Sequence, residues 1–325
     1  MTNQLDPQLK LIRELIEFPT VSRDSNLELI NFISRHLESF GVESKIIHSD
    51  CGNKANLVAT IGPNIGGGIV LSGHTDVVPV DGQDWHSDPF RLDHRDGRLY
   101  GRGTSDMKSF CAIALSLVPE MQGLKQPIHL ALSYDEEVGC LGTKSLIKLI
   151  KEEIPEPLGV IVGEPTEMRI VTAHKGITHI LTTVTGYEAH SSQQHRGVPA
   201  IMYAGRIINW LAERQSKNAD LEDKKSGFEP GYTTLHCGLI KGGTAANICA
   251  RECTFETDIR TMPGESPEDY LEELQDYIKN TLEPQMKSIQ QNTSIEISLK
   301  ANVPGFKASD DDPMVQLVKQ ITGQN

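Results

Sequence analysis

Two stretches near the N-terminus carry apolar residues at the spacing of an amphipathic helix. Asp6 and Pro7 precede the first stretch, as an N-cap and a first-turn proline do. Gly41 follows the second, where a helix commonly ends in glycine. The apolar positions are Leu9, Ile12, Leu15 and Ile16 in the first stretch and Leu29, Ile30, Ile33, Leu37 and Phe40 in the second. The pattern predicts two helices, the first ending near residues 18–19 and the second at Gly41.

Short apolar runs farther along the chain predict buried strands, with helices between them. The expected strands span residues 42–48, 56–61, 69–72, 128–133 and 158–163, and helices are expected after Asp106 and over 142–151. After Gly176 the pattern predicts strands at 177–184, 233–240 and 247–260 and helices at 200–214 and 267–282. This alternation favours an α/β fold. A chain of 325 residues is long enough for two domains.

Composition and charge argue against several classes of protein. Asp and Glu number 44 against 31 Lys and Arg, a net charge of -13, which disfavours binding to nucleic acid. The N-terminus lacks a basic region followed by an apolar core, and no apolar run approaches the roughly 18 residues of a membrane span. We therefore expect a soluble cytoplasmic protein with no membrane partner.

The cysteines are scattered and include no CxxC pair. Without a secretion signal they are most simply reduced thiols. Cys249 and Cys253 could face the same way on a strand and form part of a thiolate site, but no further ligand lies near them in the sequence. Packing is the favoured role for this pair.

Candidate chemistry begins at the end of the apolar run in GIVLSGHTDVVP. Gly73 permits a close approach of the backbone to a neighbour. If the extended conformation continues, His74 and Asp76 point to the same side, because they are two residues apart. A metal-binding histidine commonly donates its other N–H to a carboxylate or a carbonyl. The alternative is a strand end with solvated polar residues.

Carboxylates follow the later strands and turns in the same way. Asp106 stands at the start of an expected helix, where the dipole favours an anion, although an ordinary helix cap is the alternative. The strand at 128–133 runs into three acids, Asp135, Glu136 and Glu137, which need a cation or full solvation. Glu164 follows the strand at 158–163.

Strand ends of this kind gather in one crevice of an open α/β sheet. Nitrogen and carboxylate ligands without thiolate suit zinc, cobalt or manganese, and a carboxylate can bridge two ions. One of two neighbouring acids can bind metal while the other takes a proton from water. The sequence therefore predicts a metal-assisted hydrolase.

Five motifs, SGHTDVVP, GRGTSDMK, SYDEEVG, GEPT and AHKG, resemble in order and spacing those of the M20 family of metal-dependent amidohydrolases and peptidases. The resemblance implies two divalent ions, zinc foremost and cobalt as an alternative, and hydrolysis of an N-acyl amino acid. It also implies that the peptide bond after Asp106 is cis. The implied roles are metal binding by His74 and Glu164 at one ion and by Glu137 at the other, with Asp106 bridging, Asp76 orienting His74 and Glu136 as general base.

The resemblance further implies how the chain divides into domains. It implies a zinc-peptidase-like catalytic domain with a mixed sheet, formed by residues 1–176 and 303–325, and an inserted α+β lid and dimerisation domain formed by residues 177–302. In the inserted domain, His190 of EAHSS is expected to reach the reacting carbonyl of a partner subunit in a homodimer; a turn residue is the alternative. Asn247 of KGGTAANI and Arg260 of DIR are expected to bind substrate, since a guanidinium grips a carboxylate bidentately.

One feature departs from the family pattern. No histidine follows His236, whereas the family's second ion takes a histidine near the C-terminus of the catalytic domain. We therefore expect a shortened catalytic domain with an incomplete second metal site. Desuccinylases, aminoacylases and carboxypeptidases of the family remain alternatives for the activity, and so does an inactive protein that binds a ligand or pairs subunits.

Overall fold

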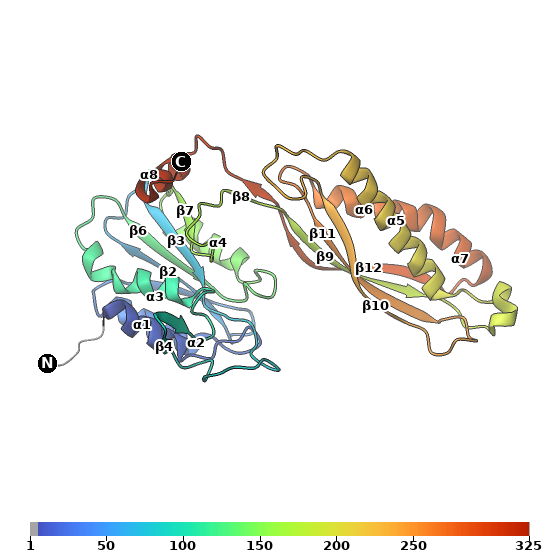
Figure 1. The fold of residues 1–325 in the computed structure, drawn as a ribbon, viewed down its shortest axis with the longest axis horizontal. Coiled ribbons are helices and arrows are strands. Elements are labelled where there is room, and N and C mark those ends of the chain that lie inside the picture. Colours follow the sequence, from blue (N-terminus) through green and yellow to red (C-terminus); the bar gives the residue numbers. More distant parts are fainter. Residues whose placement is uncertain (1–5, 325) are drawn as a thin grey trace. The chain divides into compact units, whose positions relative to one another are not determined.

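A computed structural model describes residues 6–324, which fall into two compact units. The first lies within Met1–Ile170 and Asp310–Asn325, and the second is Val171–Ser309 (Figure 1). Each unit has its own sheet and its own hydrophobic core.

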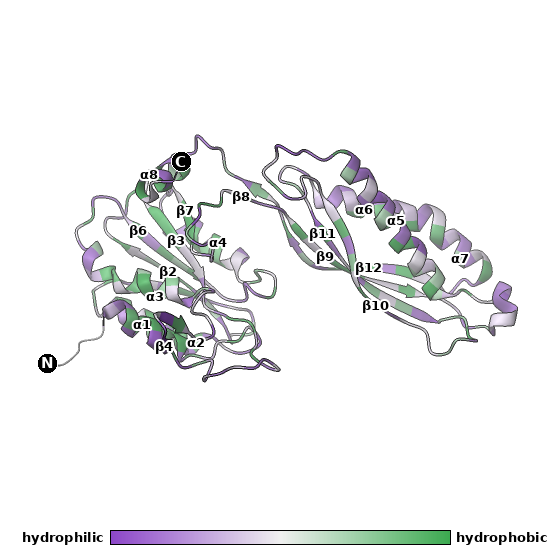
Figure 2. Ribbon diagram, in the orientation of Figure 1, coloured by the Kyte–Doolittle hydropathy of each residue, from purple (hydrophilic) through white to green (hydrophobic). Residues whose placement is uncertain are grey.

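The first unit is built on a five-stranded mixed sheet in the order β1-β2-β6-β3-β7. The strands are β1 (Ser44–His48), β2 (Ala55–Ile61), β3 (Ile69–His74), β6 (Ile128–Ser133) and β7 (Gly159–Val162). β1, β2 and β6 pair antiparallel, whereas β6, β3 and β7 pair parallel. β3, β6 and β7 are rich in hydrophobic residues, as parallel strands commonly are (Figure 2). β7 lies at the edge of the sheet, and its Val160 and Val162 are exposed.

Helices cover both faces of this sheet. They are α1 (Pro7–Ile16), α2 (Leu27–Glu38), α3 (Lys108–Ser116), α4 (Thr143–Glu153) and α8 (Pro313–Thr322). Along β6, Leu130 and Leu132 join the core formed with α1, α2 and α3, while Ala131 between them joins the core formed with Leu146 and Leu149 of α4. The alternation follows from the two-residue period of a strand.

The second unit is an α+β layer pair. Its antiparallel sheet has the order β10-β11-β9-β12, with β9 (Ile177–Thr185), β10 (Thr234–Gly242), β11 (Glu252–Arg260) and β12 (Ser294–Val303). The helices α5 (Ala200–Asp220), α6 (Pro267–Tyr277) and α7 (Glu283–Ile289) supply the helical side of its core. On β11, the side chains of Cys253, Phe255 and Ile259 are buried. Glu252 and Glu256 of the same strand are exposed. One face of this sheet is therefore packed and the other is polar.

The expected fold class is confirmed, and most expected elements form within a few residues of their predicted bounds. Residues 247–251 were wrongly expected in a strand, because β11 begins only at Glu252. The region expected to form one helix over 267–282 contains α6, which ends at Tyr277, and a π-helical turn, Ile278–Leu282. This turn leads directly into α7. Phe40, expected on an apolar face, is 39% exposed.

Short elements complete the chain. They are β4 (Asp93–Arg95), β5 (Arg98–Tyr100), β8 (Ala173–His174) and β13 (Phe306–Lys307), with 3-10 turns at Val118–Met121 and Ser191–Arg196. Among the helices of residues 6–324, none is long and apolar enough to cross a membrane.

Candidate metal centre

The parallel strands bring the expected site residues to one edge of the first sheet. His74 is the last residue of β3 and lies opposite Ser133, the last residue of β6. Ser72 lies opposite Val162, the last residue of β7, and Glu164 follows two residues later. Because parallel strands end at the same edge, His74, Glu164 and the acids after β6 converge.

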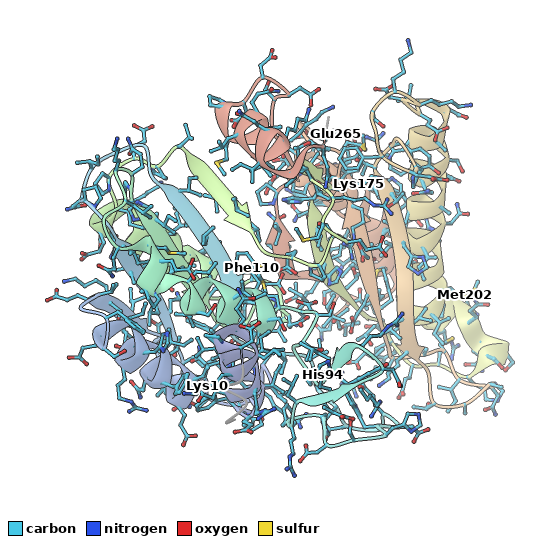
Figure 3. The ribbon with its side chains drawn as sticks, turned by 60° about the vertical axis from the view of Figure 1, so that its left-hand side comes forward. Lys10, His94, Phe110, Lys175, Met202 and Glu265 are labelled. Atoms are coloured by element: carbon cyan, nitrogen blue, oxygen red, sulfur yellow. The ribbon has the colours of Figure 1, made fainter. Side chains whose placement is uncertain are left out.

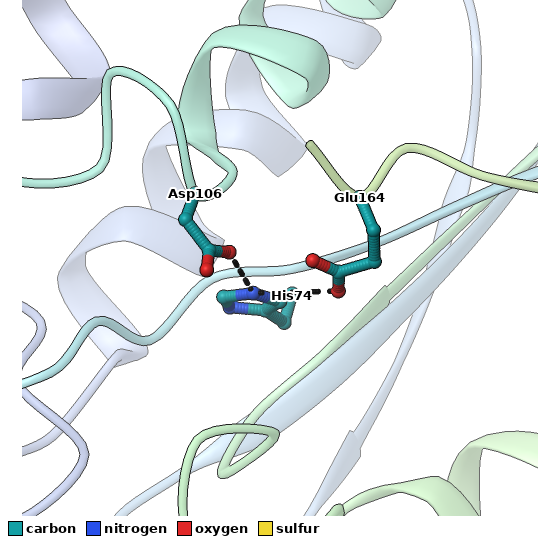
Figure 4. A group of neighbouring side chains, drawn as sticks. All are labelled: His74, Asp106 and Glu164. Atoms are coloured by element: carbon teal, nitrogen blue, oxygen red, sulfur yellow. Dashed lines mark hydrogen bonds and ion pairs between the residues drawn. The ribbon is translucent and has the colours of Figure 1, made fainter. Parts of the chain in front are cut away.

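One group in the described part of the chain could hold a metal ion: His74, Asp106 and Glu164. A ligand atom from each of the three lies within 4.8 Å of the others (Figure 4). The Nε2 atom of His74 is 2.9 Å from Oδ1 of Asp106 and 3.7 Å from Oε1 of Glu164. Oε2 of Glu136 is 3.9 Å from the same nitrogen. Three carboxylates therefore face one imidazole nitrogen.

The other ring nitrogen of His74 fixes the orientation of the ring. Nδ1–H donates to the backbone oxygen of Asp76 at 2.8 Å, and the carboxylate of Asp76 is 3.6 Å away. That carboxylate accepts instead from Ser22 Oγ at 2.6 Å and from the backbone N–H groups of Glu136 and Glu137 at 3.1 and 3.3 Å. Asp76 thus contacts His74 through its backbone and holds the following acids through its side chain.

Electrostatics at the site show an excess of negative charge. Burial raises the pKa of Glu164 to about 7, with the charges of Asp106, Glu136 and Glu137 adding to it and His74 opposing it. Burial and the charge of Asp106 also raise the pKa of Glu137. Burial disfavours a charge on His74, but Asp76, Glu164 and Glu136 outweigh it and raise its pKa to about 10. A divalent cation would relieve this repulsion, so the donor set fits a metal.

Two glycines let α3 lie close to the strand ends. A Cβ on Gly73 would lie 2.8 Å from Sγ of Cys111, which confirms the close approach expected there. A Cβ on Gly163 would lie 2.1 Å from Cγ of Phe110, a residue of α3 labelled in Figure 3. The peptide bond before Met107, the N-cap of α3, is cis, as the resemblance implied.

The remaining expected residues lie in the second unit. The backbone oxygen of Asn247 accepts from Ser191 N at 2.9 Å, next to a bridge between His190 and Ile248. Nδ1 of His190 accepts the backbone N–H of Ser192 at 3.3 Å, so its Nε2 carries the proton in the neutral ring.

Arg260 ends β11, and Asp258 two residues earlier binds it through two hydrogen bonds. Nε and Nη2 of Arg260 donate to Asp258 at 2.8 and 2.9 Å. The same carboxylate is 3.0 Å from Nε2 of His179. These contacts use one edge of the guanidinium group, and among residues 6–324 Nη1 has no hydrogen-bond partner.

The sequence model of the family described as Peptidase family M20/M25/M40 matches residues 70–325 of this chain. The chain belongs to this family.

Curated acetylornithine deacetylases are similar to this M20 chain over most or all of its length. Acetylornithine deacetylase of Proteus mirabilis is 32% identical, with 100% of this chain and 84% of the relative covered. Acetylornithine deacetylase of Myxococcus xanthus is 37% identical, with 82% of this chain and 70% of the relative covered. The expected family and the expected class of activity, metal-dependent amide hydrolysis, are confirmed.

Solved structures show the same fold. An M20 metallo-carboxypeptidase from Sulfolobus solfataricus has a TM-score of 0.75 at 18% identity, covering 98% of this chain and 84% of that chain. A Bacillus subtilis protein described as a dinuclear metal binding peptidase of the family has a TM-score of 0.59 at 15% identity, covering 93% of this chain and 75% of that chain.

Sequence reasoning missed Lys54 and Ser22 in this M20 chain. Lys54 donates to Asp135, one of the three adjacent acids, and to the backbone oxygen of Ser22. The expectation that a cation must balance these acids was the available signal. It could not name Lys54, which lies 81 residues away from Asp135 in the sequence.

Proposed function

We propose that this chain is an acetylornithine deacetylase, which hydrolyses N-acetyl-L-ornithine to L-ornithine and acetate in arginine biosynthesis. The observation that carries the proposal is the convergence of His74, Asp106 and Glu164 at one sheet edge, in a chain whose similarity to acetylornithine deacetylases extends over its length. A cytoplasmic location is part of the same proposal.

The residues proposed to hold metal are those that the family resemblance implies. His74, Glu164 and Asp106 would bind one ion, and Asp106 and Glu137 would bind a second. Zinc is the proposed metal and cobalt the alternative, because these ions accept imidazole together with carboxylate ligands. When bound, such ions lower the pKa of water and polarise the scissile carbonyl.

Glu136 is the proposed general base. Its carboxylate lies at the site, with Oε2 3.9 Å from Nε2 of His74, but it is not among the three clustered ligand atoms. It would take the proton from the attacking water and deliver it to the departing amine. The backbone N–H of Glu136 donates to the Asp76 carboxylate, and this hydrogen bond holds Glu136 at the sheet edge.

Residues of the second unit would bind substrate and stabilise charge. His190 presents Nε2–H as a donor, because Nδ1 accepts from Ser192, and we propose that it reaches the oxyanion in the partner subunit of a homodimer. Arg260 would bind the carboxylate of the substrate through the guanidinium edge that Asp258 leaves open. Asn247, beside the His190 segment, would bind substrate as well.

The decisive experiment compares kcat/KM on three substrates with metal content measured in the same samples. We expect N-acetyl-L-ornithine to exceed N-succinyl-diaminopimelate and a dipeptide, and chelation to abolish the rate. A higher rate on either competitor would assign the chain to a desuccinylase or a peptidase. Bound metal without turnover on any of the three would favour a ligand-binding or subunit-pairing protein.

A further inference from the structure

A largely buried ion pair lies beside the turn that follows β6. Nζ of Lys54, the residue before β2, donates to the carboxylate of Asp135 and to the backbone oxygen of Ser22. The side chains of Lys54 and Asp135 are 16% and 10% exposed. Solvent therefore screens this pair far less than a surface ion pair.

The backbone at Asp135 needs support from its surroundings. Its φ is 54°, in the left-handed region that residues with a Cβ rarely adopt. The backbone oxygens of Tyr134 and Asp135 accept from Gly142 and Leu141 at 3.2 and 3.0 Å, which closes the turn. Glu136, the next residue, leaves this turn toward the metal-ligand cluster.

Two side chains hold the turn from different strands. Asp76, after β3, accepts the backbone N–H groups of Glu136 and Glu137, and Lys54, before β2, binds the side chain of Asp135. Ser22 connects the two, because its hydroxyl donates to Asp76 and its backbone oxygen accepts from Lys54. The position of Glu136 is thus set by the ion pair of the preceding residue, Asp135, and by the hydrogen bonds from the backbone N–H groups of Glu136 and Glu137 to Asp76.

We infer that Lys54 is a positioning residue for the general base Glu136 and acts through its ion pair with Asp135. The inference rests on the proposed role of Glu136. Within residues 6–324, Lys54 is the only ion-pair partner of Asp135. Without it the Asp135 carboxylate is left buried and uncompensated, and it can regain solvation only if the turn moves. Such a movement displaces Glu136 from the attacking water.

The test uses four variants of the full chain. Lys54→Met removes the cation, and Asp135→Asn removes the charge of the carboxylate while keeping its shape, so the pair is tested even where Lys54→Met fails to fold. Lys54→Arg keeps the charge. Lys148→Met is the matched control, because Lys148 is a 71%-exposed lysine of α4 whose ion pair with Glu152 lies on the surface.

The measurements are kcat and KM on N-acetyl-L-ornithine, metal content, and amide hydrogen exchange of the segment 134–141. Since a misplaced catalytic group costs up to about a hundredfold, we expect kcat to fall about tenfold or more in Lys54→Met and Asp135→Asn. We expect KM and metal content to change little, exchange of 134–141 to rise, and Lys54→Arg to recover most of kcat. Lys148→Met should match the wild type in each measurement.

The outcomes separate this inference from the proposed function. A folded Asp135→Asn variant with wild-type kcat and wild-type exchange at 134–141 overturns the inference. So does a loss of kcat in Lys54→Met that Lys54→Arg fails to reverse. A wild-type chain that does not hydrolyse N-acetyl-L-ornithine contradicts the proposed function alone, and the exchange of 134–141 then decides whether Lys54 holds the turn.

Discussion

The carboxylate of Asp76 accepts the backbone N–H of Glu136 at 3.1 Å, which ties the end of β3 to the turn after β6. Asp76 also accepts the Nδ1–H of His74 through its backbone oxygen. One residue therefore orients both the proposed metal ligand and the proposed base. The geometry of metal binding and that of proton transfer thus depend on the same residue, through two separate hydrogen bonds.

Asp76→Ala should destabilise the fold as well as the site. It removes the acceptor of three hydrogen bonds, from Ser22 Oγ and from the backbone N–H groups of Glu136 and Glu137. Each donor left without a partner in a buried place costs about 1–3 kcal/mol, so we expect the free energy of unfolding to fall by roughly 3 kcal/mol or more. Urea denaturation checks this, with Ser22→Ala as the milder comparison. A change below about 1 kcal/mol would contradict the described network.

Glu136→Gln should abolish hydrolysis and leave metal binding nearly intact. Glutamine keeps the shape of the side chain but cannot accept the proton of the attacking water, and general-base catalysis contributes typically about 10²–10⁴-fold. The measurements are kcat on N-acetyl-L-ornithine and metal content of the purified variant. Loss of metal in step with activity would show that Glu136 is a ligand instead.

Asp106→Ala should lower the content of both metal ions. Asp106 lies 2.9 Å from Nε2 of His74 and is the proposed bridge, so its removal takes one ligand from each ion. Metal content is measured after equilibration with zinc, and Asp84→Ala, a change in an exposed loop, serves as the control. Unchanged stoichiometry in Asp106→Ala would refute the bridging role.

Zinc uptake by the metal-free protein should release protons and tighten as the pH rises. The pKa of His74 is raised to about 10 and that of Glu164 to about 7, so in the metal-free state both groups hold protons at pH values where a free imidazole or carboxyl has lost them. A ligand atom must give up its proton to the metal, so affinity increases with pH up to about 7 through Glu164 and up to about 10 through His74. Calorimetry in buffers of different ionisation enthalpy counts the protons. Zinc binding without proton release would contradict this set of ligands.

Two inactive variants, His190→Ala and Glu136→Gln, should complement each other when mixed. Loss of one oxyanion donor costs about 10²–10³-fold, so each variant alone is nearly inactive. If His190 acts across a dimer interface, heterodimers contain one intact composite site and regain part of the activity. Subunit exchange is demonstrated separately with differently tagged chains. No recovery despite exchange would place His190 outside the partner's active site.

The sequence predicted much of the fold because local patterns decide it. The expected strand over 128–133 coincides with β6, and the Asp6 side chain caps α1 by accepting the backbone N–H of Gln8, as its position before Pro7 suggested. Predictions failed where tertiary contacts override local preference. At residues 247–251 the backbone contacts other segments: Ile248 forms a bridge with His190, and Cys249 N donates to Ala189 O. The strand β11 therefore begins only at Glu252.

For the candidate site, too, the sequence predicted some features and only the tertiary structure showed the others. The sequence named His74, Asp106 and Glu164 as candidate ligands, because each stands at a strand or helix end, and the structure brings these three side chains together. Only the tertiary structure decided that His74 donates to the backbone of Asp76, that the Asp76 carboxylate holds the turn at Glu136, and that Lys54 balances Asp135. The strand order β2-β6-β3 creates the last two contacts, since it makes neighbours of segments that are far apart along the chain. The spacing of apolar residues in the sequence shows where each strand lies and which side chains share a face. Which strands become neighbours is decided by the packing of the whole sheet.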